Sequence, residues 1–237
     1  MSKRLLLLSN SRNYGGGYLA HAEKEIKNFF GSNVKEILFI PFAAVRFSYD
    51  EYTNIVSSKF TELGYSVRSI HQTNNYTQAI ENAQAIMVGG GNTFQLLKCF
   101  YENNILELVR SRVNEGLPYM GWSAGSNMAC PTIKTTNDMP IAQPPSFNAL
   151  DLIPFQINPH YTEATLANHQ GETRDERLAE FLVLNPDLYV AGLREGSMLQ
   201  VTGNHVELLG EKNLKILRHD QEIREYTSKD SIGFLMQ

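Results

Sequence analysis

The chain has 237 residues and a formal net charge of −4, from 21 basic and 25 acidic side chains. That length can bury a substantial core without disulfides or metals, as one large domain or two small ones. The near balance of charge gives no electrostatic case for binding nucleic acid or anionic membrane, and no apolar run approaches the ~18 residues of a membrane span.

The two cysteines, Cys99 and Cys130, do not have the spacing of a metal site or a redox motif. We therefore expect free thiols in a reducing cytosol. At the N-terminus only Leu5–Leu8 form an apolar run, whereas the apolar part of a signal peptide needs at least ~7 residues. We interpret this run as a first buried strand and expect a cytoplasmic protein.

The first half of the chain alternates short apolar runs with amphipathic stretches, a pattern that predicts buried strands separated by helices. The predicted strands are Arg4–Leu8, Glu36–Phe42, Ser66–Ile70, Ala85–Val88 and Leu117–Gly121. The predicted helices are Tyr18–Phe30, Tyr49–Leu63, Tyr76–Asn82, Thr93–Asn103 and Ile105–Glu115. Five such strands indicate an α/β fold, a three-layer sandwich with a mostly parallel sheet covered on both faces.

The second half of the chain has a different sequence pattern. Residues 131–147 carry four prolines and lack helical periodicity, which predicts a long loop. Beyond the loop the pattern predicts a strand, a helix, a strand and two C-terminal β-hairpins. In chain order these are Phe155–Asn158, Thr173–Val183, Leu188–Leu193, Met198–Val201 with His205–Leu209, and Leu214–Leu217 with Glu222–Tyr226. No linker or repeat interrupts the chain, so we expect a single α/β domain over residues 1–237.

The segment Gly121-Trp122-Ser123-Ala124-Gly125 has the form G-x-S-x-G of a nucleophile elbow. A predicted strand precedes it, and residues 126–129 can open a helix. A serine on such a sharp turn is pushed out of the sheet, where its hydroxyl can attack a carbonyl carbon. The alternative is an ordinary turn, which the strand before and the helix after disfavour.

Two glycine clusters follow predicted strands, at residues 15–17 and 89–91. Neither has the residues of a P-loop or of a dinucleotide-binding fingerprint. Each can bare backbone N–H groups at the start of a helix, where negative charge is stabilised. We assign the N–H groups of Gly91 and Ala124 to an oxyanion hole for Ser123. The alternative for residues 89–91 is a tight turn that binds nothing.

A serine nucleophile needs a base, and His160 is the favoured histidine. It follows the strand Phe155–Asn158 directly, so we expect it at the same sheet edge as Ser123. Two of its rivals, His205 and His219, are expected at the surface of the hairpins. The remaining histidines are His21, His71 and His169.

The third member should be a carboxylate that holds the imidazole tautomer. Glu195 follows the strand Leu188–Leu193 and is expected at that same edge. Asp138 and Asp187 are rivals, although Asp187 precedes its strand and should face the wrong edge. A salt bridge from Glu195 to Arg194 is the structural alternative to a catalytic role.

Four motifs together resemble those of peptidase family S51: G-G-G-N-T at 89–93, the elbow, N-P-H-Y at 158–161 and R-E-G at 194–196. Their order and spacing match over essentially the whole chain. The resemblance implies a Ser–His–Glu triad at Ser123, His160 and Glu195, with no metal or cofactor. It also implies a flavodoxin-like fold related to class I glutamine amidotransferases, with serine replacing their cysteine.

The family's activity, hydrolysis of dipeptides that begin with aspartate, implies residues that read the substrate. Arg174 matches the arginine that would bind the β-carboxylate, and Asp138 matches a position suited to the ammonium group or the S1 site. Without the resemblance, Arg174 would be a solvated charge beside Asp175 or Glu176, and Asp138 an ordinary loop residue. The expected partner is a small peptide with an N-terminal aspartate, neither nucleic acid nor membrane; the sequence leaves a homodimer open.

Three other functions compete. One is a cyanophycinase-like hydrolase of β-linked Asp-Arg peptides, which would also need a site for the arginine side chain. Another is an esterase of the α/β-hydrolase type that uses His205 or His219. The third is a non-catalytic flavodoxin-like protein whose glycine turns bind a phosphate or nucleotide.

Overall fold

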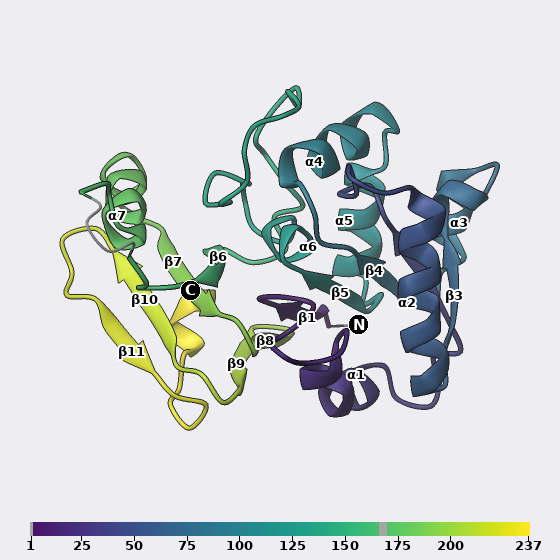
Figure 1. Cartoon of the computed structure of the whole chain (residues 1–237), viewed down its shortest axis with the longest axis horizontal. Coiled ribbons are helices and arrows are strands. Elements are labelled where there is room, and N and C mark those ends of the chain that lie inside the picture. Colours follow the sequence, from purple (N-terminus) through teal and green to yellow (C-terminus); the bar gives the residue numbers. More distant parts are fainter. Residues whose placement is uncertain (1, 166–169) are drawn as a thin grey trace.

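The computed structural model describes residues 2–165 and 170–237. Its main sheet has seven strands in the order β3-β2-β4-β5-β1-β8-β9 (Figure 1). Their bounds are β1 Arg4–Leu8, β2 Glu36–Ile40, β3 Ser66–Ser69, β4 Ile86–Val88, β5 Tyr119–Trp122, β8 Ser197–Thr202 and β9 His205–Gly210. The first five of these strands are mutually parallel, and β8 and β9 are antiparallel to their neighbours. The predicted α/β sheet is confirmed.

Helices cover both faces of this sheet. The helices are α1 Glu23–Phe30, α2 Tyr49–Leu63, α3 Tyr76–Glu81, α4 Thr93–Glu102, α5 Leu106–Asn114 and α6 Ala124–Asn127. Alternate residues of β1 enter different cores, because successive strand side chains point to opposite faces. Leu6 and Leu8 pack with α1 and α2, while Leu5 and Leu7 pack with α3, α4 and α5. The predicted three-layer arrangement is therefore confirmed.

Local sequence sets the start of α2. Ser48 caps its N-terminus, and Ser48 and Glu51 form a capping box that satisfies otherwise unpaired N–H groups. The predicted bounds Tyr49–Leu63 are confirmed. The expected helix Tyr18–Phe30 is shorter: a 3₁₀ turn at Ala20–Ala22 precedes α1, and Leu19 has a φ of 53°. A left-handed residue at that position keeps the α-helix from starting earlier.

A second sheet of four strands stands beside the first, in the order β11-β10-β7-β6. It contains β6 Gln156–Tyr161, β7 Tyr189–Arg194, β10 Leu214–Arg218 and β11 Arg224–Tyr226. The helix α7, Arg174–Leu184, covers it through Leu178 and Leu182. In Figure 1 this unit lies to the left of the view, and α2 and β3 lie to the right.

The expectation that His160 and Glu195 share the edge of one sheet with Ser123 is wrong. The strands β6 and β7 belong to the second sheet, and Ser123 follows β5 of the first. The reason is that β8 pairs antiparallel with β1 and occupies its free edge, from Arg4 opposite Thr202 to Leu8 opposite Met198. Both predicted C-terminal hairpins do form, but one completes each sheet.

Residues 131–147 contain no helix and no ladder strand, as predicted, only an isolated bridge between Thr132 and Asn148. The loop is nevertheless anchored. Asp138 accepts hydrogen bonds from the Thr93 N–H at 2.7 Å and from its hydroxyl at 2.6 Å. Because Thr93 is the first residue of α4, the carboxylate binds at the positive end of that helix.

Candidate active site

Ser123 occupies a strained turn between β5 and α6. Its φ of 52° and ψ of −114° lie outside the regions that an ordinary side chain adopts. The flanking glycines make the turn possible. A Cβ on Gly125 would lie 2.1 Å from the Val88 carbonyl oxygen, and one on Gly121 would lie 2.4 Å from that of Gly125. The strain is therefore maintained by close backbone packing, which is typical of functional turns.

The three residues predicted to act together are joined by hydrogen bonds. The Ser123 Oγ lies 2.9 Å from His160 Nε2, and His160 Nδ1 lies 2.7 Å from Glu195 Oε1. An ionised carboxylate can only accept, so Nδ1 carries the ring proton and Nε2 is free to accept from the serine hydroxyl. His160 Nε2 is therefore placed to take the proton of the Ser123 hydroxyl.

His160 reaches Ser123 from the second sheet through a distorted strand. The register of β6 against β7 shifts between Asn158 and Tyr161, and His160 has a φ of 52°. Its N–H donates to the Ser9 hydroxyl at 2.8 Å, and that hydroxyl donates to the Leu193 carbonyl at 2.8 Å. Ser9 directly follows β1, so a single buried hydroxyl joins the two sheets behind the base.

The turn that carries Glu195 is held by Asn10, the residue after Ser9. Asn10, which is 1% exposed, accepts a hydrogen bond from the Gly196 N–H at 2.9 Å. Gly196 has a φ of 89°, which favours glycine at this turn. The sequence interpretation missed both Ser9 and Asn10. Their signal was available, because two polar residues directly after a buried parallel strand lie at its ligand-binding end.

The structure supports neither the salt bridge considered for Glu195 nor the two carboxylates considered as its rivals. Arg194 pairs with Glu163 and with Glu225 at 2.5 Å, so it is not the partner of Glu195. Asp138 binds Thr93, and Asp187 precedes β7 at the end opposite Glu195. Of these carboxylates, Glu195 is the one bonded to His160.

The other histidines have different surroundings. His219 lies 3.3 Å from Asp220, and His71 contacts Ser69 and Asp50. The exposed His205 begins β9, and His169 lies outside the described residues. His21 is of interest: burial lowers its pKa, while the charges of Glu25 and Glu195 act in the opposite direction.

A cavity of about 430 Å³ opens at Ser123 and His160. Its wall is mostly aromatic and aliphatic, formed by Tyr18, Phe47, Tyr52, Ile55 and Trp122, and it also includes Ser11, Arg12, Gly90 and Gly91. Its volume lies within the ~300–1,000 Å³ range of small-molecule sites. A substrate of a few residues can therefore reach the serine hydroxyl.

A second cavity, of about 290 Å³, contains Arg174 and Asp138. Arg174 donates to Asn158 Oδ1 at 3.1 Å and also to Asn137 Oδ1. Asp175 binds Lys215 at 2.8 Å and Glu176 binds Thr173, so neither pairs with Arg174. Burial lowers the pKa of the Arg174 guanidinium, and the charge of Arg177 acts in the same direction. Within the described residues this cation has no carboxylate partner.

The glycine turn after β4 is tightly packed. A Cβ on Gly91 would lie 2.2 Å from the Ala43 carbonyl oxygen, and the φ of Gly91 is 141°. Asn92 then caps α4 by accepting from the Gln95 N–H. Ala124 is the first residue of α6, so its N–H has no acceptor within that helix. The turn thus brings Gly90 and Gly91 to the Ser123 cavity. Close backbone packing explains why position 91 requires a glycine.

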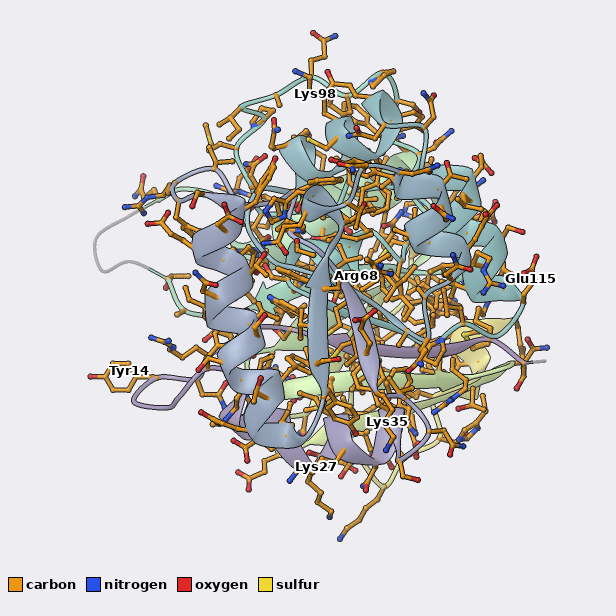
Figure 2. The ribbon with its side chains drawn as sticks, turned by 90° about the vertical axis from the view of Figure 1, so that its right-hand side faces the viewer. Tyr14, Lys27, Lys35, Arg68, Lys98 and Glu115 are labelled. Atoms are coloured by element: carbon orange, nitrogen blue, oxygen red, sulfur yellow. The ribbon has the colours of Figure 1, made fainter. Side chains whose placement is uncertain are left out.

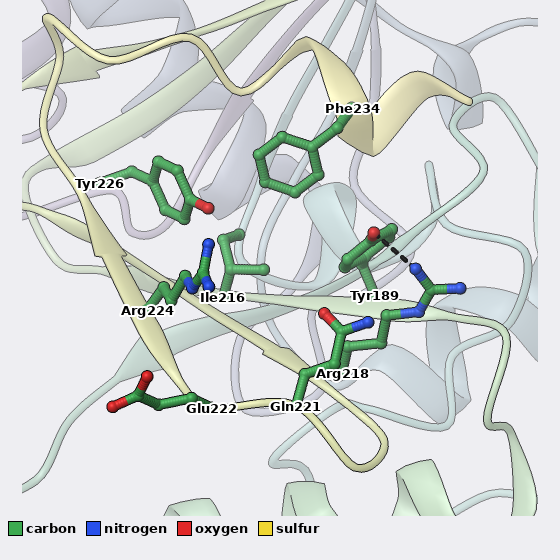
Figure 3. Close-up of a pocket in the computed structure, with 8 residues that line it drawn as sticks. All are labelled: Tyr189, Ile216, Arg218, Gln221, Glu222, Arg224, Tyr226 and Phe234. Atoms are coloured by element: carbon green, nitrogen blue, oxygen red, sulfur yellow. Dashed lines mark hydrogen bonds between the residues drawn. The ribbon is translucent and has the colours of Figure 1, made fainter.

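A further hollow lies on the second sheet and contains no serine nucleophile or histidine among its lining residues (Figure 3). Arg218 stacks on Tyr189 and donates to its hydroxyl at 2.7 Å, with Phe234 beside them. In the described part of the chain, no three His, Cys, Asp or Glu side chains gather where they could hold a metal ion. Every described helix is also too short or too polar to span a lipid bilayer.

The chain is similar to several known proteins. The model of peptidase family S51 matches residues 5–209. Peptidase E of Nostoc sp. is 54% identical over 237 residues, covering all of this chain and 98% of that protein. A probable alpha-aspartyl dipeptidase of Drosophila melanogaster is 46% identical over 239 residues, covering 100% of this chain and 98% of that protein.

A solved structure has the same fold. The peptidase from an acI-B1 actinobacterium has a TM-score of 0.71 at 19% identity, and the match covers 98% of this chain and 97% of that one. The family model and the relatives extend over nearly all of the chain, including the elbow, the Asn158–Tyr161 segment and the turn at Glu195. The chain therefore belongs to peptidase family S51.

Proposed function

We propose that this protein is a serine dipeptidase that hydrolyses the peptide bond after an N-terminal aspartate. Membership of the S51 family and the names of its relatives support a serine dipeptidase. The observation that carries the proposal is the hydrogen-bonded series Ser123–His160–Glu195 at the mouth of a cavity. It supplies a nucleophile, a base and an orienting carboxylate without a cofactor.

In the proposed mechanism Ser123 attacks the carbonyl carbon of the aspartyl residue while His160 Nε2 takes its proton. Glu195 holds Nδ1–H and stabilises the imidazolium that forms. His160 then gives its proton to the leaving amine as the peptide bond breaks. The acyl-enzyme is hydrolysed by water, which His160 activates in the same way.

The developing oxyanion needs two donors. We assign them to the backbone N–H groups of Gly91 and Ala124. The free first-turn N–H of α6 and the approach of Gly91 to the Ser123 cavity support this assignment. Preorganised donors of this kind cost no rearrangement during the reaction, which makes them effective in a partly desolvated site.

Specificity for aspartate is assigned to Arg174. Its guanidinium is partly buried and has no carboxylate partner within the described residues, so the charge is available for an anion. It binds Asn158, which lies two residues before the proposed base on β6. A planar guanidinium suits two-point binding of a carboxylate, and the substrate's β-carboxylate is such a group.

Asp138 lines the same cavity as Arg174. Its described hydrogen bonds, from Thr93 and Thr136, all end on Oδ2. We propose that Oδ1 receives the α-ammonium group of the substrate. The anchoring of Oδ2 at the start of α4 would hold the carboxylate in place for that contact.

The test compares kcat/KM for Asp–Leu and Asn–Leu in the wild type and in Arg174→Met. Asn–Leu is nearly isosteric but uncharged, so binding it would leave a desolvated guanidinium without its anion. The wild type should favour Asp–Leu by ~10² or more, and the variant should lose most of that preference. Arg177→Met is the matched comparison, because Arg177 lies one turn along α7 and is paired with Glu172. It should change the ratio far less.

An unchanged ratio in Arg174→Met would contradict the assignment of specificity. A β-Asp-Arg dipeptide belongs in the same panel, since the cyanophycinase-like alternative predicts that it is the better substrate. The relatives do not favour that alternative. Failure of Asp–Leu together with cleavage of β-Asp-Arg would overturn the proposed substrate class.

A further inference from the structure

Two cavities are lined by residues of β6, and they differ in their chemistry. The cavity of Arg174 is lined by Asn158, and the cavity of Ser123 is lined by His160, two residues further along the same strand. The residues that line the two cavities, within the described chain, do not overlap. If the aspartyl side chain binds Arg174, the leaving residue must extend from the scissile bond into the Ser123 cavity.

The Ser123 cavity has an apolar wall that is partly open to water. Phe47 and Ile55 are 43% and 47% exposed, and Tyr18 and Trp122 pack edge to face beside them. Large apolar side chains in such a position lose unfavourable contact with water when an apolar group covers them. This wall fits the side chain of a leaving residue such as leucine.

One cation lies at this wall. Among the described lining residues, Arg12 is the only Lys or Arg, and no Asp or Glu accompanies it. Arg12 and Tyr18 line the same cavity, and the Arg12 guanidinium opposes the rise in the pKa of Tyr18 that burial causes. Within the described chain Arg12 has no ion-pair partner, so its charge is available to a ligand.

The backbone that carries Arg12 is fixed to the proposed catalytic residues. Asn10 donates to the Arg12 carbonyl at 2.8 Å and accepts from Gly196, the residue after Glu195. Beyond this point the loop turns outward, and Figure 2 shows Tyr14 projecting away from the body of the molecule. Arg12 therefore stands at the boundary between the anchored segment and the exposed tip.

We propose that Arg12 binds the free C-terminal carboxylate of the leaving residue and so restricts the enzyme to dipeptides. The inference rests on the proposed function. In a dipeptide the α-carboxylate is separated from the scissile nitrogen by one carbon atom, so its position is fixed once the peptide bond lies at Ser123. In a longer peptide that charge is displaced by at least one residue, and in an amide it is absent, so in both cases the guanidinium loses its two-point partner.

The experiment measures kcat/KM for Asp–Leu and Asp–leucinamide in the wild type, Arg12→Gln and Arg12→Lys. The wild type should favour Asp–Leu by about tenfold or more, since a charge-assisted pair is made with one substrate alone. Arg12→Gln should lower kcat/KM for Asp–Leu by about the same factor and leave Asp–leucinamide nearly unchanged. Arg12→Lys should retain part of the preference, because it keeps the charge without the fork geometry.

The matched control is Arg68→Gln, which removes an exposed arginine on β3 that is paired with Glu36 (Figure 2). It should leave both substrates unchanged. Hydrolysis of aspartyl p-nitroanilide, which has no carboxylate on its leaving group, separates the two proposals. If the wild type cleaves neither the anilide nor Asp–Leu, the proposed function fails.

Two results would overturn the inference while the proposed function stands. One is an equal fall for Asp–Leu and Asp–leucinamide in Arg12→Gln. The other is a change in the ratio of Asp–Leu to Asn–Leu in that variant, which would put the Arg12 charge at the aspartyl side chain instead.

Discussion

Ser123 and its two proposed partners are held in place by different kinds of structure. Ser123 sits in the main sheet on a turn whose backbone is packed against other backbone, with glycines where any side chain would collide. His160 and Glu195 come from the second sheet, and their side chains are 40% and 51% exposed. Hydrogen bonds that Ser9 and Asn10 accept from the backbone, rather than steric contact, fix the chain around them.

The difference separates two tasks. A nucleophile must be held at one point, and dense backbone packing does this at the cost of a strained φ. A base must accept a proton and release it, which a partly exposed imidazole oriented by a carboxylate can do. Substitutions around Ser123 should therefore impair the enzyme in a different way from substitutions around His160 and Glu195.

The largest effect should come from removing the nucleophile. Ser123→Ala should lower kcat by ~10⁴–10⁶ while the melting temperature stays close to that of the wild type, because the strained backbone is kept. Kinetics with Asp–Leu and a thermal melt measure the two quantities. Activity within tenfold of the wild type would exclude the serine mechanism. Labelling by a serine-directed phosphonate should also disappear in this variant, which separates an enzyme from a non-catalytic binding protein.

Glu195→Gln should be severe but milder. A neutral amide can still contact the imidazole, but it does not stabilise the imidazolium, so a loss of about 10²–10⁴ in kcat is expected. Glu225→Gln is the matched control, since Glu225 binds Arg194 close by but does not contact His160 in the described structure. Equal losses in the two variants would mean that the ion pairs of the second sheet matter rather than the orientation of the base.

Gly125→Ala tests the packing that holds the elbow. Its Cβ would lie 2.1 Å from the Val88 carbonyl oxygen, so the backbone must move. We expect about 1–3 kcal/mol of lost stability, as for other overpacked sites, and about a 10²-fold loss of kcat from the displaced serine. Gly17→Ala is the control, because its nearest contact would be an ordinary 3.7 Å. A variant that keeps both stability and activity would show that the elbow does not need this close approach.

The smallest effect should come from the histidines of the hairpin strands. His205 is exposed at the start of β9, and His219 lies beside Asp220 after β10. Alanine at either position should change kcat/KM by less than about twofold and stability by less than about 0.5 kcal/mol. If one of them were essential and His160 dispensable, the esterase alternative would replace the proposed triad.

Patterns confined to short segments were sufficient for much of the fold. The apolar runs and amphipathic stretches before residue 120 predicted the parallel strands and their helices, because period and burial are local consequences of the residues themselves. The G-x-S-x-G segment predicted a sharp turn, because its two glycines leave room for the close backbone contacts on either side of Ser123. For the same reason the hairpin around Gly203 was predictable, since turn chemistry depends on a few neighbouring residues.

The sequence by itself therefore determined the five parallel strands, the elbow and the residue types available for the site. Tertiary structure alone decided that β8 takes the free edge of β1 and leaves β6 and β7 to build a second sheet. It also decided that Ser9 and Asn10 join that sheet to the first behind His160 and Glu195. Strand pairing and such long-range hydrogen bonds depend on which edges and polar groups remain unpaired once the rest of the chain has folded, and no local pattern records that.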